Sequence, residues 1–407
     1  MTRSADIRLG ALLALLVLAM NVLSVSARLG FVHKAKQVKE SDHWRYIHMS
    51  RGAQGNPALQ EEPPYCYRLA VPAAARGLVR LGLSENVAFY LLTNAVLFGF
   101  LFLLWVHLDD LGFSTPLRVT GLLLVGFMQG AVRWPLYQYW MTDPAGVFLV
   151  MLAFHMVERE RRGVLAATSV VAAFVRETYV LVYPYILLRD LRTGRGITPA
   201  VVRTVAIAAL PLAILVTVRQ VVQSSGPDSF GEAIVDNIGF RWRHLLDNQP
   251  YVMTVGSFGV LLPLALLFPR RLPGLVRRHF DRAFFLFSVY LSLSISNNTE
   301  RPLAYALPVV VPAALLGLRS FLAETRLPSL PVLAVAVALQ VLFWWGQRWA
   351  EAGMSIHQPV NWTTVAAVIS GWVAAQFILR ARLRPSLIAP ASRGCTDRCR
   401  DGDRSPS

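Results

Sequence analysis

Apolar runs about as long as a bilayer is thick dominate this 407-residue chain. Hydrophobic residues make up 55% of it, and they gather in runs of about 20 residues, the length at which a helix crosses about 30 Å of hydrocarbon. We therefore expect an all-α, polytopic transmembrane helix bundle of about 10–12 membrane segments. This membrane domain covers residues 1–380. The expected spans are 8–26, 86–107, 117–132, 144–157, 163–188, 200–219, 251–268, 283–296, 302–318, 328–346 and 362–380.

Arginine clusters between the apolar runs predict the orientation, because short inside loops carry an excess of Lys and Arg. The clusters expected inside are Arg159, Arg161 and Arg162; Arg189, Arg192 and Arg195; Arg270, Arg271, Arg277, Arg278 and Arg282; and Arg319 and Arg326. Both termini are then cytoplasmic, and residues 381–407 form a disordered cytoplasmic tail. The exterior loops lie near 27–85, 133–143, 220–250, 297–301 and 347–361. These signals account for the net charge of +16, and without a basic patch interleaved with aromatics we expect no nucleic-acid partner.

One segment breaks the alternation of inside and outside loops. Residues 163–188 have arginine clusters on both sides, yet about 26 residues are too few for two full crossings at about 1.5 Å per residue. A short re-entrant hairpin with its apex near Arg176 and Glu177 satisfies both constraints. The alternative is one long tilted helix.

The long first exterior loop, residues 27–85, is the expected location of the active site. Asp42, among aromatic residues at the water–lipid boundary, is placed to act as a general base toward a hydroxyl. The alternative without a catalytic role is that Asp42 is a solvated loop aspartate. Arg68 has the planar fork that binds phosphate at two points, or it snorkels to the lipid headgroups. The candidate substrate-binding residues of this loop are His43, Tyr46, Glu62, Tyr67 and Arg68.

Further candidate substrate-binding residues lie elsewhere on the predicted exterior side. Asp143, in Thr-Asp-Pro, is explained equally well as part of a helix cap or as a catalytic or metal-binding carboxylate. Arg301 in a short turn is a candidate clamp for a lipid phosphate, or it solvates the turn. Arg176 and Glu177, deep in apolar sequence, either pair structurally or face a polar cavity. The aromatics at 134–140 are expected to form an interfacial belt.

Taken in order, these motifs resemble a known family of membrane enzymes. The motifs are Asp42 with Tyr46, Tyr-x-Tyr-Arg-Leu-x-x-Pro at 65–72, Thr-Asp-Pro at 142–144, Arg-Glu-Thr at 176–178, and Thr-x-Arg followed by proline at 299–308. Over roughly residues 8–320 the chain resembles polytopic glycosyltransferases of the GT-C superfamily, in particular bacterial members related to dolichyl-phosphate-mannose mannosyltransferases. It departs from their pattern in having no Asp-x-Asp in the first loop. The adjacent Asp109 and Asp110 fall on the predicted cytoplasmic side, so Asp42 is the one acidic candidate for catalysis rather than a member of a pair.

The resemblance implies transfer of a sugar from a polyprenyl-phosphate donor to a glycan, lipid or protein acceptor, with inversion at the anomeric carbon. By that analogy Asp42 is the catalytic base, Arg68 and Arg301 neutralise the leaving phosphate, and Asp143 lies near the donor or a divalent cation. No metal-ligand set is assigned. The implied location is the bacterial inner membrane, among membrane lipids, as part of cell-envelope synthesis.

Two other functions remain open at this point. A transporter or lipid flippase would use Arg176 and Glu177 to line a pathway, with the first loop as a lid, although no internal repeat supports it. A non-catalytic membrane protein of envelope assembly would keep the fold without the chemistry.

Overall fold

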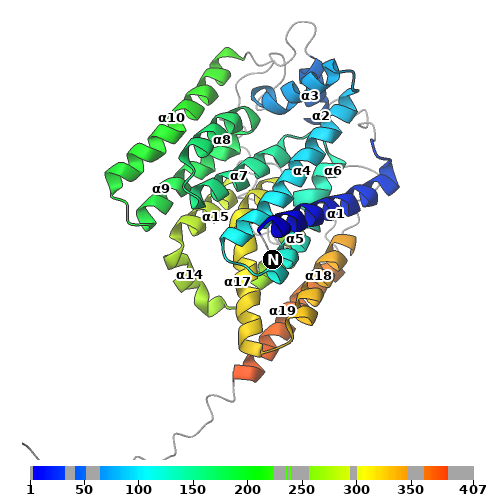
Figure 1. Cartoon of the computed structure of the whole chain (residues 1–407), viewed down its shortest axis with the longest axis vertical. Helices are drawn as coiled ribbons and strands as arrows, with labels where there is room; N and C mark the ends of the chain where they lie inside the picture. The colour runs from blue at the N-terminus through cyan, green and yellow to red at the C-terminus, as the bar shows by residue number, and fades with distance from the viewer. Residues whose placement is uncertain are drawn as a thin grey trace, which may run out of the picture.

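The computed structural model describes residues 3–32, 42–51, 65–222, 235, 239, 256–293, 300–346 and 362–383. Every regular element in these ranges is a helix, so the all-α prediction is confirmed for the described chain (Figure 1). By length and composition, four of the described helices are able to cross a membrane: Ser4–Ala27, Glu85–Asp110, Ile197–Val221 and Ala304–Thr325. A bent pair, Thr115–Gly126 with Gly130–Tyr137, makes a fifth if it is counted as one span. The chain is therefore an integral membrane protein.

The helices follow the apolar runs of the sequence closely. In chain order they are α1 (Arg3–Leu29), α2 (Asp42–Arg51), η2 (Tyr65–Tyr67), α3 (Ala70–Arg80), α4 (Glu85–Asp110), α5 (Thr115–Gly126), η3 (Gln129–Arg133), α6 (Trp134–Tyr137), α7 (Asp143–Glu158), α8 (Arg162–Val175), η4 (Glu177–Leu181), α9 (Val182–Arg192), α10 (Ile197–Val221), α13 (Leu261–Ala265), η5 (Pro269–Arg271), α14 (Leu272–Arg278), α15 (Phe280–Ser292), α16 (Glu300–Leu303), η6 (Ala304–Ala306), α17 (Leu307–Thr325), α18 (Ser329–Gly346) and α19 (Trp362–Leu383). Helices α4 and α7 pack together in the centre, flanked by α1, α5, α8 and α17.

One end of the bundle carries the arginine clusters, and we call it the arginine-rich end. It comprises the turns 110–114, 159–161 and 193–196 with the residues around 278–282. Ion pairs connect these turns: Arg159–Asp110 (2.7 Å), Arg189–Glu158 (2.7 Å), Arg282–Glu158 (2.6 Å) and Arg195–Glu160 (3.5 Å). The start of α1 lies at the same end, because Asp6 pairs with Arg118 at 2.7 Å. The loops that the sequence assigned to one side of the membrane thus lie together.

Helices α8 and α9 form a hairpin that leaves the arginine-rich end and returns to it. Helix α8 ends at Val175, Arg176 is extended (φ −165°, ψ 133°), and η4 turns the chain back into α9. The Ser169 and Tyr179 hydroxyls lie 3.1 Å apart across the fold. At about 1.5 Å per residue, the 14 residues of α8 measure about 21 Å, less than the about 30 Å of a hydrocarbon core. The alternative of one long tilted helix is wrong.

Two expected spans are interrupted, and the same glutamine stabilises both interruptions. Residues 251–268 are not one helix in the described part, since Gly259 has φ +53° and α13 begins only at Leu261. Residues 117–132 are not one helix either, because the chain bends by 66° after α5. Gln340, buried on α18, accepts a hydrogen bond from the Val260 N–H (2.9 Å) and donates one to the Phe127 carbonyl (3.0 Å). It thereby satisfies backbone groups that a broken helix leaves open.

The first predicted loop contains helices that pack on the bundle. Helices α2 and α3 contact each other, and α3 lies on α4. They enclose a small apolar core that includes Tyr46, Tyr139 and Trp140, all at most 1% exposed. The belt interpretation is therefore wrong for Tyr139 and Trp140, whose rings pack inside the protein. Residues 33–41, 52–64 and the predicted tail from 384 onward lie outside the described residues.

Candidate functional site

Arg68 is the centre of a buried polar cluster at the end of the bundle opposite the arginine-rich end. It follows η2 and is 5% exposed, which contradicts the headgroup-snorkelling alternative. Its guanidinium binds the Glu177 carboxylate at two points, Nε to Oε2 at 3.2 Å and Nη2 to Oε1. The remaining nitrogen, Nη1, donates to the Tyr46 hydroxyl at 3.0 Å. The Arg68 side chain thus links Tyr46 to Glu177.

Tyr46 connects this cluster to the start of α7. It is fully buried on α2, and its hydroxyl lies 3.5 Å from Oγ1 of Thr142. Its ring meets that of Tyr65 edge to face at 5.9 Å, and the Arg45 guanidinium lies 4.4 Å from the centre of the Tyr65 ring. Because the Tyr46 ring packs against Tyr65 and its hydroxyl accepts a hydrogen bond from Arg68, this hydroxyl is held in a fixed direction.

Asp143 and Arg176 form a second ion pair in the same cluster, with Nη1 of Arg176 2.8 Å from Oδ1 of Asp143. Helix α7 begins at Asp143 with Pro144 in its first turn, as the sequence predicts, and a carboxylate is favourable at a helix N-terminus. The Thr142 side chain makes no capping hydrogen bond. Arg176 reaches Asp143 from the break between α8 and η4, where the extended backbone turns the hairpin.

Tyr305 completes the cluster, although the sequence analysis did not single it out as a site residue. It lies in η6, is 1% exposed, and interacts electrostatically with Arg176 and Asp143. Within the described part of the chain its hydroxyl has no hydrogen-bond partner. Gly146 on α7 makes room for it, since a Cβ at position 146 would overlap the hydroxyl. The available signal was a tyrosine four residues after Arg301, in a motif already noted.

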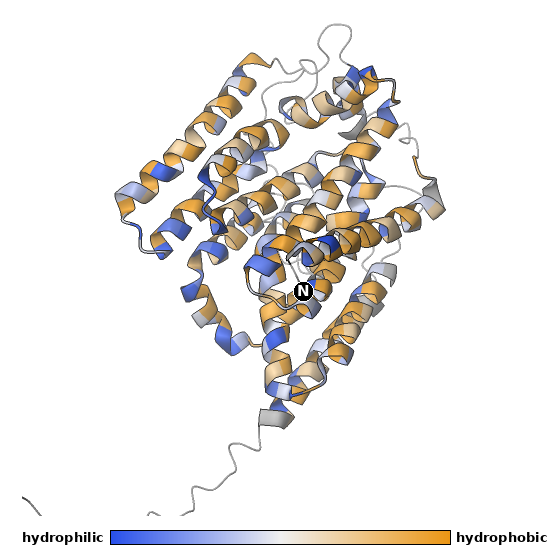
Figure 2. Ribbon diagram, viewed as in Figure 1, coloured by the Kyte–Doolittle hydropathy of each residue, from blue (hydrophilic) through white to orange (hydrophobic). Residues whose placement is uncertain are grey.

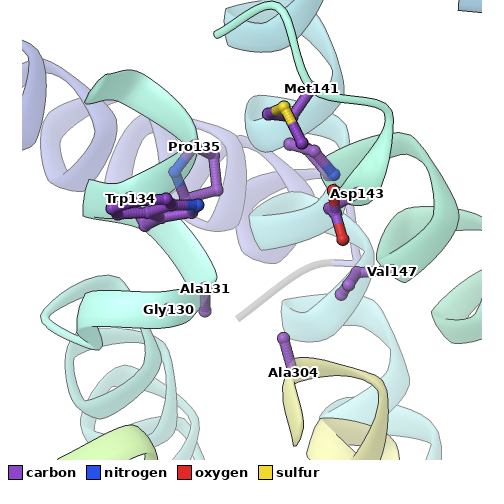
Figure 3. Close-up of a pocket in the computed structure, with 9 residues that line it drawn as sticks. Gly130, Ala131, Trp134, Pro135, Met141, Asp143, Val147 and Ala304 are labelled. Carbon is purple, nitrogen blue, oxygen red and sulfur yellow. The ribbon is translucent and has the colours of Figure 1, made fainter. Parts of the chain in front are cut away.

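A narrow pocket opens beside Asp143 (Figure 3). In the view shown, Trp134 and Pro135 lie on one side and Met141 and Asp143 on the other, with Ala304 below. The cavity measures about 10 Å³, room for about one water molecule. This pocket by itself is therefore too small for a sugar or a lipid phosphate.

The charges of the cluster balance. Arg68 and Arg176 are matched by Glu177 and Asp143, one carboxylate to each guanidinium. Burial acts to lower the pKa of the Arg68 guanidinium, but the Glu177 carboxylate and Tyr46 outweigh it and hold this pKa above its ordinary value. Among the described residues no group of three or more His, Cys, Asp or Glu side chains is arranged to hold a metal ion.

The predicted site residues divide into those that meet and those that do not. Tyr46, Arg68, Asp143, Arg176 and Glu177 meet in the cluster. Tyr67 does not, since its ring packs with Cys66 and Val222 and faces Arg219 at 5.5 Å.

Four predicted residues are not described at the level of their side chains. Asp42 and His43 lie in the first turn of α2, one turn before Tyr46, and Arg301 lies in α16, next to η6; only their backbones are described. Glu62 lies outside the described residues.

Comparison with known proteins adds no relative: no protein-family model matches the chain, and no curated protein is detectably similar to it.

Proposed function

We propose that the chain is a GT-C-type membrane glycosyltransferase that transfers a sugar from a polyprenyl-phosphate donor to an acceptor. One observation carries the proposal. Four segments that are distant in sequence, at 46, 68, 142–143 and 176–177, hold the motifs of the family resemblance and converge on one buried cluster. A fifth, η6, brings in Tyr305 from within the last motif, residues 299–308. Burying several charged groups together costs free energy unless the groups pair with one another or serve a function.

The proposed reaction is an inverting displacement. The acceptor oxygen bonds to the anomeric carbon, the bond from that carbon to the phosphate oxygen breaks, and the electron pair leaves with the phosphate. The acceptor proton passes to a carboxylate, for which we propose Asp42. Fixed cations stabilise the charge that develops on the leaving group, and Arg68 and Arg301 are proposed for this role.

The pairing of Arg68 with Glu177 adds a step to this scheme. The Glu177 carboxylate fills the Nε–Nη2 edge of the Arg68 guanidinium and the Tyr46 hydroxyl is bonded to Nη1, so neither edge is open to bind a phosphate at two points. The Glu177 side chain is 27% exposed and the Arg68 side chain 6%, so the carboxylate lies on the accessible side of the pair. We propose that the donor phosphate displaces Glu177 from Arg68 as the pocket opens. Glu177 thereby keeps the empty site neutral.

The proposal includes the arrangement in the membrane. The arginine-rich end is cytoplasmic, with both termini on that side, and the cluster faces the exterior of a bacterial inner membrane. The hairpin α8–η4–α9 is re-entrant, with Arg176 and Glu177 at its apex. The shorter helices complete a set of about 10–12 membrane segments around the spans identified by length.

The test is donor turnover by purified protein in vesicles. Release of polyprenyl phosphate from a panel of polyprenyl-phosphate hexoses is measured for the wild type, Asp42→Asn and Arg68→Gln. We expect Asp42→Asn to lose about 10²-fold or more of the rate, the contribution of a positioned base. Glu85→Gln is the control, because it neutralises a carboxylate at the surface, at the end of the first loop region, where Glu85 pairs with Arg51.

Two outcomes would count against the proposal. Undiminished release by Asp42→Asn removes Asp42 from the mechanism. The second outcome is that neither the wild type nor any variant releases polyprenyl phosphate, while the wild type moves a fluorescent lipid across the vesicle membrane and Glu177→Gln impairs this movement. That outcome favours the flippase alternative.

A further inference from the structure

A large apolar cavity lies away from the polar cluster, among the helices of the C-terminal part. It measures about 460 Å³, within the range of ligand sites in proteins. One face each of α13, α18 and α19 and the last turns of α17 enclose it. Its walls include Leu264, Phe321, Val332, Ala336, Trp372 and Ala375, and every residue that lines it is apolar or glycine.

The apolar lining of the cavity excludes water as its natural content. Helix α17 belongs to a span, and α18 and α19 are apolar along most of their length (Figure 2). A buried water needs two or more polar partners, and the one polar side-chain atom of the lining is already used, since Nε1 of Trp372 donates to the Leu266 carbonyl at 3.4 Å. An empty cavity would forfeit dispersion contacts on all sides. Hydrocarbon is the content that fits these walls.

Arginine side chains surround the opening of the cavity at which α17 ends and α18 begins. Arg326 is exposed and directly precedes Leu327 of the lining, and Arg380 is exposed two residues after Ile378 of the lining. Neither side chain has an ion-pair partner within the described chain. Arg271, which covers the Phe268 ring at 4.7 Å, pairs with Glu324 at the same opening.

We propose that this cavity binds one acyl chain of an anionic phospholipid, whose headgroup is held by Arg326 and Arg380. An anionic headgroup matches the unpaired guanidiniums, because arginine binds phosphate with charge-assisted hydrogen bonds. The acyl chain fills the space between α18 and α19, which otherwise enclose a void. The site belongs to the leaflet at the arginine-rich end and is independent of the proposed sugar transfer.

Photolabelling in vesicles tests the acyl-chain part of the proposal. The protein is reconstituted in phosphatidylcholine vesicles that contain a trace of phosphatidylglycerol with a diazirine in its acyl chain, and labelled peptides are mapped after illumination. We expect labels on the cavity faces of α18 and α19. Ala375→Phe fills the cavity and should lower this labelling severalfold, whereas Val373→Phe, on the lipid-facing side of α19, should leave it unchanged. Ala336→Phe fills the cavity from the opposite wall and serves if the first variant does not fold.

Labelling that is equal on all faces and unaffected by either filling variant would overturn the site. Absence of lipid labels from these faces, together with disulfide cross-links between two copies of the chain through cysteines introduced on α18 and α19, would show a self-association surface and also overturn it. The headgroup part is tested with Arg326→Gln combined with Arg380→Gln. We expect this variant to lose the preference for the phosphatidylglycerol probe over the corresponding phosphatidylcholine probe, and equal labelling by both probes in the wild type would refute the anionic headgroup.

Discussion

Replacement of Glu177 by glutamine should destabilise the protein strongly while changing its shape little. Glutamine keeps the size of the side chain and its carbonyl still accepts one hydrogen bond from Arg68, but the counter-charge is lost. Arg68 is 5% exposed, and its other described side-chain hydrogen bond is the one it donates to the Tyr46 hydroxyl. The cluster, neutral with two arginines and two carboxylates, becomes singly positive.

The magnitude follows from the burial of the pair. Removal of one partner from a buried ion pair costs about 3–5 kcal/mol, because the other charge stays desolvated. We take about 3 kcal/mol for Glu177→Gln, roughly a 100-fold change in the unfolding equilibrium. Replacement of both partners, Arg68→Met with Glu177→Met, should recover most of this loss, because apolar residues of similar volume often substitute for a buried pair at little cost.

The assay is unfolding by SDS in mixed micelles, followed by tryptophan fluorescence, for Glu177→Gln, for the single variants Arg68→Met and Glu177→Met, and for the double variant that combines these two. The control is Glu85→Gln. Its pair with Arg51 has similar two-point geometry, but the side chains are 50% (Arg51) and 28% (Glu85) exposed, so the loss should be about 0–1 kcal/mol. Equal losses for Glu177→Gln and Glu85→Gln would refute the argument from burial. A double variant that is no more stable than the worse single variant would show that the two residues act separately.

Two further predictions concern packing and topology. Gly317→Ala should destabilise the contact of α17 with α13 and lower the stability measured in the same SDS titration, because a Cβ at position 317 meets the Leu264 backbone carbonyl. Gly77→Ala should instead raise stability by about 0.5–1 kcal/mol, because open space surrounds position 77 in α3. Single cysteines in place of Glu160 and Gly194, in a chain whose own cysteines are replaced, should react with an impermeant maleimide from one side of the membrane and a cysteine at Gly82 from the other. Labelling of positions 160 and 194 from opposite sides of the membrane would contradict the proposal that the hairpin is re-entrant.

The sequence predicted the helices well wherever hydrophobicity and turn chemistry act locally. Helix α7 begins at Asp143 with Pro144 behind it, because proline suits the first turn of a helix. The hairpin at Arg176 was predicted from two arginine clusters that are too close for two crossings. Both predictions use only neighbouring residues and the thickness of a bilayer.

Interruptions of helices depended on contacts that no local pattern records. Gln340 is a single polar residue in an apolar run, and nothing near it in sequence indicates that it bonds Phe127 and Val260, both at least 80 residues away. The belt interpretation of Tyr139 and Trp140 failed for the same reason. Aromatic residues next to a span suit an interface, but here α2 and α3 cover them.

The sequence predicted that the candidate site residues lie at the same end of the bundle, but not which of them pair. The positions of Arg68, Asp143, Arg176 and Glu177 at the same end follow from topology, yet which carboxylate meets which arginine is set by packing. The pairing found is crosswise, since the adjacent residues Arg176 and Glu177 each bind a partner from a different segment. An adjacent pair that bonded to itself would leave the apex of the hairpin without an ion pair to either neighbouring segment. The crosswise arrangement instead ties the apex of the hairpin to both α7 and the segment before α3. A phosphate that displaced Glu177 from Arg68 would therefore also loosen the hairpin from that segment, so that binding of an anion and opening of the narrow pocket beside Asp143 would be coupled through one ion pair.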